Sequence, residues 1–431
     1  MAGQGISDAD GARLLQRARW RLIPFMFVLY VVSYLDRINV GFAALQMNAD
    51  LGFGASTYGL GAGIFFLSYV AFEIPSNLVM ARVGARVWIA RIMITWGLVS
   101  AGMMFVSGTS SFYVLRFLLG VAEAGFFPGM ILYLTYWFPD DERARAVALF
   151  MTATALAGVV GGPVSGALLS LHQVAGLAGW QWLFLVEGLP AVALGIVVLV
   201  YLDNGPAEAK WLTDAERVWL TERLARDHRA RHMSAHHSFR RAAASRRVWQ
   251  LALIYFAIVA GFYGISFWLP QIVQGASNRS PLEVGLVSAL PYVAAAVGMV
   301  WVGRHSDRTG ERRGHVAVAA LVGAAGLVAA SQMTALTASV VCLSVAALGI
   351  WSALGPFWAL PTMTLSGPAA AGGIALINSV GNVGGFVGPY LVGFVRERTA
   401  SFSAALMTLA ALLVVGAALT IVVDRERPGS R

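Results

Sequence analysis

Two short stretches, Gly158-Val-Val-Gly-Gly-Pro163 and Gly384-Gly-Phe-Val-Gly-Pro389, share two glycines and a proline and lie 226 positions apart. A second pair of stretches, 77–86 and 303–312, shares arginine and glycine positions at the same offset. One offset that aligns two unrelated motifs indicates an internal repeat. We therefore predict that the chain consists of two structurally equivalent halves.

The composition is that of a membrane protein. Of the 431 residues, 58% are hydrophobic and 12% are charged, with a mean hydropathy of +0.69, whereas about 25% of residues are charged in soluble proteins. A helix needs ~20 apolar residues to cross a hydrocarbon core of ~30 Å. We expect twelve such spans, at 22–46, 57–80, 87–107, 112–137, 145–171, 181–202, 249–274, 283–302, 314–334, 338–365, 371–395 and 401–423.

These spans divide six and six around one long polar break. We predict an all-α membrane protein with twelve transmembrane helices in two six-helix pseudo-symmetric halves, 1–202 and 249–431, joined by a cytoplasmic linker at 203–248. Repeats of matching topology are related by an axis along the membrane normal, an arrangement that supports rocking around a site at the midplane. The repeated glycines allow close helix packing; a role in the rocking hinge is an equally good interpretation.

Positive charge is concentrated in alternate connections. If the N-terminus is cytoplasmic, 26 of the 31 Lys and Arg residues lie in cytoplasmic segments, and only Arg279, Arg396 and Arg398 lie outside. The positive-inside rule therefore predicts a multi-pass protein of the inner (plasma) membrane with both termini in the cytoplasm. It also accounts for the net charge of +9 without a nucleic-acid partner.

Neither the first apolar run nor the cysteine content adds a constraint on the fold. The first apolar run is too long for a cleaved signal peptide. The single cysteine, Cys342, lies in a predicted span and excludes an intrachain disulfide.

The linker is predicted to contain an amphipathic helix. Thr213-Asp-Ala-Glu216 is a capping-box sequence that begins a helix running to about Arg226. With Trp211 and Trp219, this helix could lie along the inner membrane surface, or it could be a solvated linker. The segment that follows, 229–245, is expected to be mobile.

Six ionisable residues fall within the predicted spans, all of them in the first half. A charge at the centre of a membrane helix costs roughly 2.5–3.5 kcal/mol on insertion scales, so each should be paired or face a wet cavity. They are Asp36, Arg37, Glu73, Arg116, Glu123 and Glu187.

Depth along the helices suggests how four of these residues act together. Arg37 and Arg116 both reach the outer half of the bilayer at a rise of ~1.5 Å per residue, and two arginines at one depth can bind a carboxylate as a fork. Glu123 shares a helix face with Arg116 and with Gly120, which would open room between them. Asp36 and Arg37 are adjacent, so one is expected to face the cavity and the other a neighbouring helix.

A carboxyl group beside these arginines could couple transport to protons. When a substrate anion occupies the arginine, the carboxyl group loses its partner and can bind a proton. We therefore expect Asp36 and Glu123 to act in proton coupling and Arg37 and Arg116 to bind substrate. The alternative is a static ion pair that holds the first and fourth spans together.

Other polar residues in the spans are open to both interpretations. Tyr69 could offer a hydroxyl group to a substrate or serve only in packing, and Asn378 and Asn382 could bind a ligand or bond between helices. Glu73 precedes a helix-breaking proline and is expected to be structural. Glu187 is expected to be a structural anchor near the outer face.

The motifs that carry these residues resemble the major facilitator superfamily over nearly the full chain. Within it, the sequence is similar to the anion:cation symporter family, which includes tartrate, phthalate, hydroxyphenylacetate and sugar-acid permeases. The resemblance lies in Tyr34-Leu-Asp-Arg-Ile-Asn39, Phe72-Glu-Ile-Pro-Ser-Asn77, Arg116-Phe-Leu-Leu-Gly-Val-Ala-Glu123-Ala-Gly-Phe-Phe-Pro-Gly129, Phe267-Trp-Leu-Pro270, Gly303-Arg-His-Ser-Asp-Arg-Thr-Gly-Glu-Arg312 and Asn378-Ser-Val-Gly-Asn382.

This resemblance implies proton-coupled uptake of organic anions by alternating access. It implies that Arg37 and Arg116 contact the substrate carboxylate and that Tyr69 and Asn378 line the site. Ala81 stands where the superfamily usually has an acidic residue, whereas Asp307 keeps that acid in the second half. We therefore expect Asp307 and Arg308 to carry more of the inner gate.

The expected function is symport of protons with a small carboxylate such as tartrate, a sugar acid or an aromatic acid. An exporter or exchanger of organic anions is the alternative, and an intramembrane enzyme or receptor is less well supported because no HExxH, P-loop or membrane histidine cluster is present. The expected partners are the anion, protons and the lipid bilayer. We expect no cofactor, no metal and a monomeric chain.

Overall fold

The computed structural model describes residues 8–232, 243–277, 279–364 and 368–423. Within these ranges the chain is built from helices and contains no strand. The helices of the first half and the linker are α1 (Asp8–Leu51), α2 (Ala55–Val83), α3 (Ala85–Gly102), α4 (Thr109–Glu123), α5 (Phe126–Thr135), α6 (Asp140–Leu169), α7 (Gly179–Tyr201) and α8 (Asp214–His232). Those of the second half are α10 (Arg246–Gly275), α11 (Pro281–Thr309), α12 (Arg313–Ser331), α13 (Leu336–Thr364), α14 (Pro368–Thr399) and α15 (Phe402–Val422).

Eleven segments of the described chain are long and apolar enough to cross a membrane. The twelfth predicted span corresponds to α14, which has 32 residues but carries Asn378, Asn382 and several glycines that lower its hydropathy. Because α14 packs against α2 on one side and α10 on the other, its polar groups meet protein as well as lipid. The all-α fold with twelve long helical segments agrees with the prediction from the sequence.

The fourth predicted span is not one continuous helix. It breaks immediately after Glu123, and α5 begins three residues later. Gly125 has a φ of 83°, a left-handed conformation that glycine adopts without the cost imposed on other residues. The break lets Gly125 lie directly against Ser76 and Asn77 of α2. Discontinuous helices are common at the substrate sites of membrane transporters.

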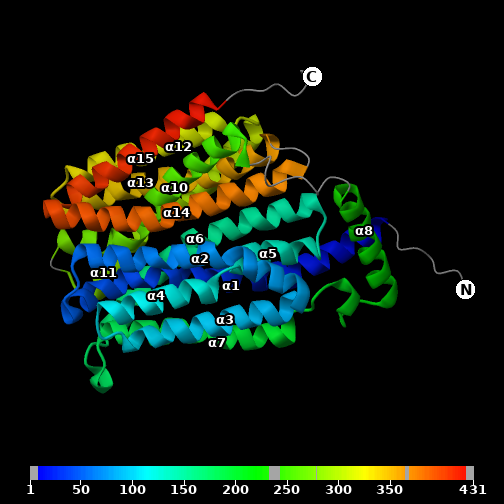
Figure 1. Cartoon of the computed structure of the whole chain (residues 1–431), viewed down its shortest axis with the longest axis horizontal. Helices are drawn as coiled ribbons and strands as arrows, with labels where there is room; N and C mark the ends of the chain where they lie inside the picture. Colours follow the sequence, from blue (N-terminus) through cyan, green and yellow to red (C-terminus); the bar gives the residue numbers. More distant parts are fainter. Residues whose placement is uncertain (1–7, 233–242, 278, 365–367, 424–431) are drawn as a thin grey trace, which may run out of the picture.

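The two halves meet along three helix pairs. In Figure 1 the helices α1 to α7, coloured from blue to green, lie beside the group α10 to α15, and contacts between the groups join α6 with α11, α2 with α14 and α1 with α10. Glycines carry these crossings: a methyl group at Gly162 would collide with the Gly285 carbonyl oxygen, and one at Gly59 would lie 2.7 Å from the Pro389 carbonyl oxygen. The repeated glycine motif therefore serves close backbone packing.

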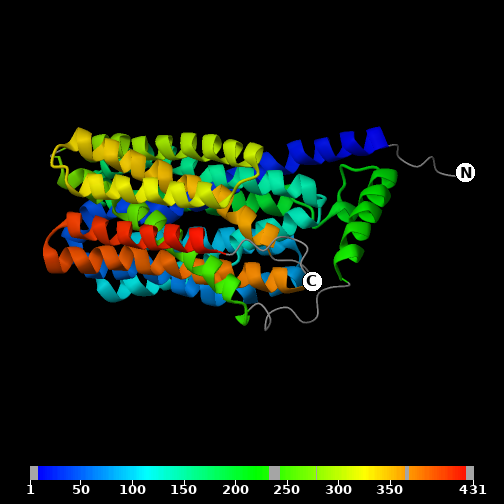
Figure 2. The same ribbon diagram turned by 90° about the horizontal axis from the view of Figure 1, so that it is seen from above.

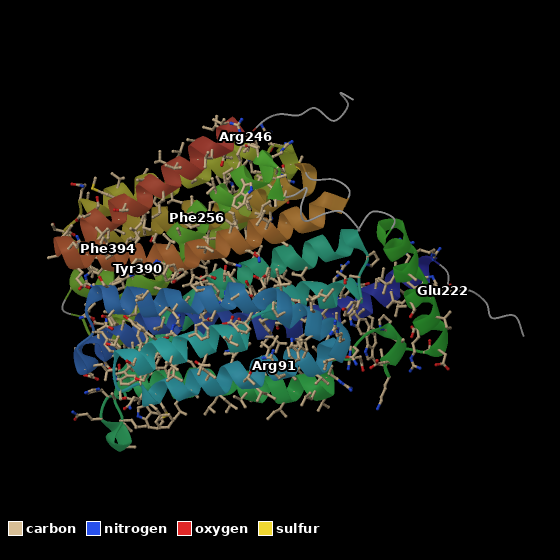
Figure 3. All side chains as sticks on the ribbon, viewed as in Figure 1. Arg91, Glu222, Arg246, Phe256, Tyr390 and Phe394 are labelled. Carbon is tan, nitrogen blue, oxygen red and sulfur yellow. The ribbon has the colours of Figure 1, made fainter. Side chains whose placement is uncertain are left out.

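All of these crossings lie toward one end of the bundle. They involve the first turns of α2 and α11 and the later turns of α6, α10 and α14. Figure 3 labels Tyr390 and Phe394 at that end and Arg246 and Glu222 at the opposite end, where α8 and the first turns of α1 lie. The halves are therefore packed backbone against backbone at the end away from α8.

The linker helix α8 is docked on the protein. Figure 2 shows α8 standing across the end of the bundle beside the first turns of α1, which project beyond the other helices. Arg17 on α1 binds Glu216 at 2.8 Å, and Arg17 and Arg21 lie over the ring of Trp211. Trp219 packs on Gly11 of the same α1 extension.

We expected this helix either to lie along the inner membrane surface or to be a solvated linker; Trp211 and Trp219 in fact pack on the start of α1. The reason is that α1 begins at Asp8, well before the apolar run, and offers arginines and a glycine that receive both indoles. The capping box is present, since the Thr213 N–H donates to Glu216 Oε2 at 2.8 Å, but the helix continues to His232 rather than ending near Arg226. Most of the segment predicted to be mobile lies outside the described residues.

The turn between α2 and α3 is held by the linker. Gly84 in this turn has a φ of 98°, and the N–H of Arg86 donates to Asn204 Oδ1 at 3.1 Å. Ala81 lines a nearby cavity of about 450 Å³ whose lining residues, shared with α5 and α8, carry no charge. In the first half, where Ala81 stands in place of the usual acidic residue, the turn is thus anchored by Asn204 of the linker.

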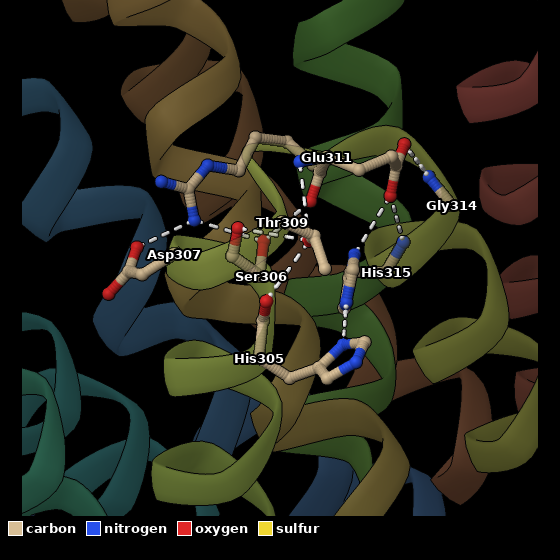
Figure 4. A network of polar contacts seen from close by, with 8 residues as sticks. His305, Ser306, Asp307, Thr309, Glu311, Gly314 and His315 are labelled. Carbon is tan, nitrogen blue, oxygen red and sulfur yellow. Dashed lines mark hydrogen bonds and ion pairs between the residues drawn. The ribbon is translucent and has the colours of Figure 1, made fainter.

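The equivalent turn between α11 and α12 is held by its own side chains (Figure 4). Arg312 donates to Asp307 at 2.7 Å and to Ser306 Oγ at 3.0 Å. His315 bonds to Glu311 at 2.8 Å and, through its other ring nitrogen, to His305 at 2.7 Å. Burial alone would raise the pKa of Glu311, but hydrogen bonds from the Gly314 N–H and from His315 outweigh it and hold that pKa below its usual range.

Candidate functional site

An ion pair between α1 and α4 lies at the centre of the site. Arg37 binds the carboxylate of Glu123, the last residue of α4, and Ser33 Oγ donates to the same carboxylate oxygen at 2.9 Å. The other terminal nitrogen of Arg37 donates to the Tyr263 hydroxyl of α10 at 3.0 Å. One guanidinium group is therefore bonded to both halves of the molecule.

Asp36 points in a different direction from Arg37. Its Oδ1 accepts hydrogen bonds from Ser100 on α3 and, at 3.1 Å, from Asn39 one turn along α1. Side chains at adjacent helix positions diverge by about 100°. We expected one of the two residues to face the cavity and the other a neighbouring helix; Arg37 turns toward α10 and Asp36 toward α3. Among the described residues, no hydrogen bond or ion pair joins Asp36 to α4.

Arg116 is enclosed rather than exposed to the space between the halves. Its exposed fraction is 0%, compared with 8% for Arg37. Its Nε and one terminal nitrogen donate to the backbone carbonyls of Gly61 and Ala62 on α2, at 3.2 and 3.0 Å. The predicted fork of two arginines is therefore not formed, because the guanidinium of Arg116 is turned toward the α2 backbone.

Gly120 does not open room between Arg116 and Glu123 as predicted. The space beside it is filled by α2, since a methyl group there would collide with Ser68 Oγ and the Phe65 carbonyl oxygen. The guanidinium groups of Arg37 and Arg116 each lie 5.2 Å from the centroid of the Phe65 ring. Glycine at 120 thus lets α4 cross α2 closely and keeps Arg116 packed against that helix.

A second group of polar residues lies between α2 and α14. The guanidinium of Arg37 is 5.3 Å from the ring centroid of Tyr69, and Glu73 follows Tyr69 by one helical turn. Glu73 Oε1 accepts a hydrogen bond from Asn378 Nδ2 at 2.8 Å. Asn378 and Asn382 are partly exposed at successive turns of α14. The structure therefore brings these residues to one region with Arg37.

The remaining predicted residues lie apart from this group. Glu187 accepts a hydrogen bond from Ser165 at 2.7 Å, which ties α7 to α6 within the first half, in keeping with a structural anchor. Asp307 is engaged with Arg312 in its own turn, and Arg308 is exposed. In the described parts of the chain, no group of three His, Cys, Asp or Glu side chains is placed to hold a metal ion.

Ser33 and Tyr263 were not singled out from the sequence as contacts of the charged pair. Ser33 precedes Arg37 by one helical turn, a spacing that places both on one face. Tyr263 stands at the position of Arg37 plus the repeat offset of 226, a signal that could have identified it.

Membrane-length helices in two repeated halves, closed together at one end and with a buried ion pair beside their interface, are the architecture of a secondary transporter. Comparison with known proteins identifies the family. The model of the Major Facilitator Superfamily matches residues 26–389 and 278–431. The chain therefore belongs to the Major Facilitator Superfamily, as its motifs indicated, and it is a transporter rather than an enzyme.

Relatives and solved structures agree with this assignment. A putative tartrate transporter of Agrobacterium vitis is 52% identical over 97% of this chain and 92% of its own length. The putative metabolite transport protein NicT of Pseudomonas putida is 46% identical over 96% of each chain. A bacterial homolog of the human lysosomal transporter Spinster, crystallised in an inward-facing and occupied conformation, matches the fold with a TM-score of 0.78 and 16% identity, covering 95% of this chain and 99% of that one.

Proposed function

We propose that the protein is a symporter that takes up a small organic carboxylate together with protons by alternating access. The observation that carries this proposal is the buried pair of Arg37 and Glu123, in which one guanidinium is shared between an internal carboxylate and a residue of the opposite half. The tartrate transporter among the relatives supports an organic acid as substrate. Tartrate, a sugar acid and an aromatic acid all carry the required carboxylate.

The proposed coupling follows from competition for Arg37. A substrate carboxylate that binds Arg37 displaces Glu123, because both are anions that need the same charge-assisted hydrogen bonds. Glu123 is then left with Ser33 in an enclosed environment where an unpaired charge is costly. Binding a proton removes that charge, so substrate and proton are bound together.

Proton entry also makes uptake of an anion energetically possible. Moving one elementary charge against a membrane potential of 100 mV costs ~2.3 kcal/mol. An anion that enters a cell with a negative interior meets this cost, and one proton per negative charge offsets it. We propose Asp36, which has an oxygen without a hydrogen-bond partner among the described residues, as a second proton-coupling group.

The other residues take supporting parts in this proposal. Tyr69, Asn378 and Asn382 would contact the substrate beside Arg37. Arg116 would act as a positioning residue, because its bonds to the α2 carbonyls fix the helix that carries Tyr69. Asp307 and Arg308 would form part of the inner gate, with Asp307 held in place by Arg312.

The orientation in the membrane follows from the distribution of charge. We propose that the termini and the linker lie in the cytoplasm and that the two rocking bodies are 1–202 and 249–431, joined by 203–248, in a monomer of the inner membrane. The glycine crossings are then on the outer side, and the structure represents a state closed to the outside. The inward-facing state of the Spinster homolog is consistent with this arrangement.

Reconstitution into liposomes tests the proposal. Vesicles with an acidic exterior should accumulate labelled tartrate or another small carboxylate above its external concentration, and a protonophore should abolish the accumulation. An exchanger would instead require a counter-anion inside the vesicles, and its uptake of labelled carboxylate would not depend on the pH gradient. If a panel of hydroxy, sugar and aromatic acids shows no gradient-driven accumulation, the proposed symport is wrong.

A further inference from the structure

The carboxylate of Glu73 on α2 is only half satisfied. Its Oε1 accepts from Asn378 at 2.8 Å, whereas its Oε2 is buried and has no hydrogen-bond partner among the described residues. The residue as a whole is 6% exposed. A buried acceptor without a donor is energetically costly. This oxygen is therefore poised to accept a hydrogen bond from a group that enters the site.

Glu73 lies within the region proposed to bind substrate. It follows Tyr69 by one helical turn, a rise of ~6 Å along α2, and the Tyr69 ring lies beside the guanidinium of Arg37. Glu73 is also close enough to Arg37 for the two charges to interact. Asn378, its partner, is partly exposed, so the pair is not fully enclosed by protein. The site thus holds a cation beside Tyr69 and a free acceptor one helical turn further along α2.

We propose that Glu73 is a specificity-determining residue that accepts a hydrogen bond from a hydroxyl group of the substrate while Arg37 holds its carboxylate. This inference rests on the proposed function and narrows the substrate class to short hydroxycarboxylates. An unsubstituted dicarboxylate brings no donor, so it leaves the Glu73 oxygen unpaired. Sites built to bond a hydroxyl reject analogues that lack it for this reason.

A pair of matched ligands tests the proposal. Tartrate and succinate have the same carbon chain and two carboxylates, and only tartrate carries hydroxyl groups. Dissociation constants measured by calorimetry on the purified protein in detergent should favour tartrate by at least about tenfold in the wild type. Glu73→Met, which keeps the volume but removes the acceptor, should weaken tartrate binding by about tenfold and leave succinate binding unchanged or tighter.

Two further variants complete the test. Glu187→Met removes another buried membrane glutamate, one that is bonded to Ser165 away from the site, and should keep the wild-type ratio of affinities. Glu73→Gln places an amide N–H₂ where the free oxygen stood, if its oxygen retains the bond from Asn378, and should shift the ratio toward succinate. This second variant decides the question if the methionine variant does not fold.

The outcomes separate this inference from the proposed function. A wild type that binds both acids without preference, or Glu73 variants that keep the wild-type ratio, would overturn the role of Glu73 and leave carboxylate transport standing. An equal loss of both ligands in the Glu73 variants would also overturn it, since that result indicates a structural role. A wild type that binds no carboxylate of any kind would overturn both proposals.

Discussion

Arg37 and Tyr263 occupy equivalent positions in the two halves of the chain and are bonded to each other. They are 226 residues apart, the offset that relates the repeated motifs, and the guanidinium donates to the hydroxyl at 3.0 Å. Gly41 and Phe267, separated by the same offset, are also in contact. Equivalent residues of a two-fold repeat touch only near the symmetry axis. The charged pair of Arg37 and Glu123 therefore lies beside the axis that relates the two halves.

The first prediction concerns Glu123. Replacing it with Gln removes the carboxylate that is proposed to leave Arg37 and bind a proton. It keeps a hydrogen-bonding side chain beside Ser33. Glu123→Gln should therefore lose accumulation driven by a pH gradient while retaining exchange of labelled for unlabelled substrate. Glu187→Gln, a matched change at a buried glutamate that is bonded to Ser165 rather than to Arg37, should keep accumulation. Full gradient-driven uptake by Glu123→Gln would remove Glu123 from the proton pathway.

Substitutions of Arg37 and Arg116 should differ in their effects on substrate affinity and on thermal stability. Arg37→Ala removes the group proposed to hold the substrate carboxylate, so the dissociation constant should rise by roughly 10- to 100-fold, the usual worth of hydrogen bonds to charged groups. Arg116 is fully enclosed where α4 packs on α2. Arg116→Ala therefore leaves a cavity there and should lower the Tm in detergent more than Arg37→Ala does. A larger loss of affinity for Arg116→Ala than for Arg37→Ala would restore the two-arginine fork.

The glycine crossings should control which side of the transporter is closed. A methyl group at Gly162 collides with the Gly285 carbonyl, so Gly162→Ala should favour separation of α6 from α11. The rate at which an impermeant maleimide labels Ala289→Cys, in a Cys342→Ser background, reports this opening and should rise. Gly355→Ala is the control, because a methyl group there meets no atom within 4 Å. Equal labelling of both variants would mean that the crossing does not limit closure.

The turn between α11 and α12 should contribute stability that depends on pH. The pKa of Glu311 is held below its usual range in the folded protein, so the folded state binds the proton less readily than the unfolded chain. Its contribution is complete above the unfolded glutamate pKa of about 4.3 and is lost as the pH falls below it toward the folded pKa. Glu311→Gln should thus lower the Tm at pH 7, with the difference shrinking below about pH 4.

Glu222→Gln provides the comparison for that experiment. Glu222 is an exposed residue of α8, and its replacement should leave the Tm close to that of the wild type at both pH values. A difference in Tm between wild type and Glu311→Gln that is equally large at pH 7 and at low pH would show that the carboxylate charge of Glu311 is not the stabilising feature.

Much of the fold could be predicted because the membrane restricts the possible structures. Apolar runs of sufficient length must be helices, and the 226-residue offset relates the halves directly from the sequence. The identity of the charged residues was predictable for the same reason, since an unpaired charge in lipid is costly. The family assignment followed from the motifs around those charges.

The rotation of each helix about its axis could not be predicted from the sequence. Arg37 and Arg116 are both buried within the bundle, but which direction each faces depends on where neighbouring helices cross. Gly120 looked like open space and is instead the point where α2 passes α4. The break at Gly125 depends on a positive φ that no apolar pattern reports. Docking of α8 depends on the length of α1 before its apolar run.

The glycine crossings also bear on how fast the transporter can turn over. Interdigitated side chains would have to leave one set of rotamers and find another each time the halves separate, which adds to the barrier between states. At Gly162 with Gly285, and at Gly59 with Pro389, the opposing surfaces are backbone and present no side chain to reorganise. These two crossings can therefore part and reseal without a change of rotamer, so we expect them to add little to the barrier between states.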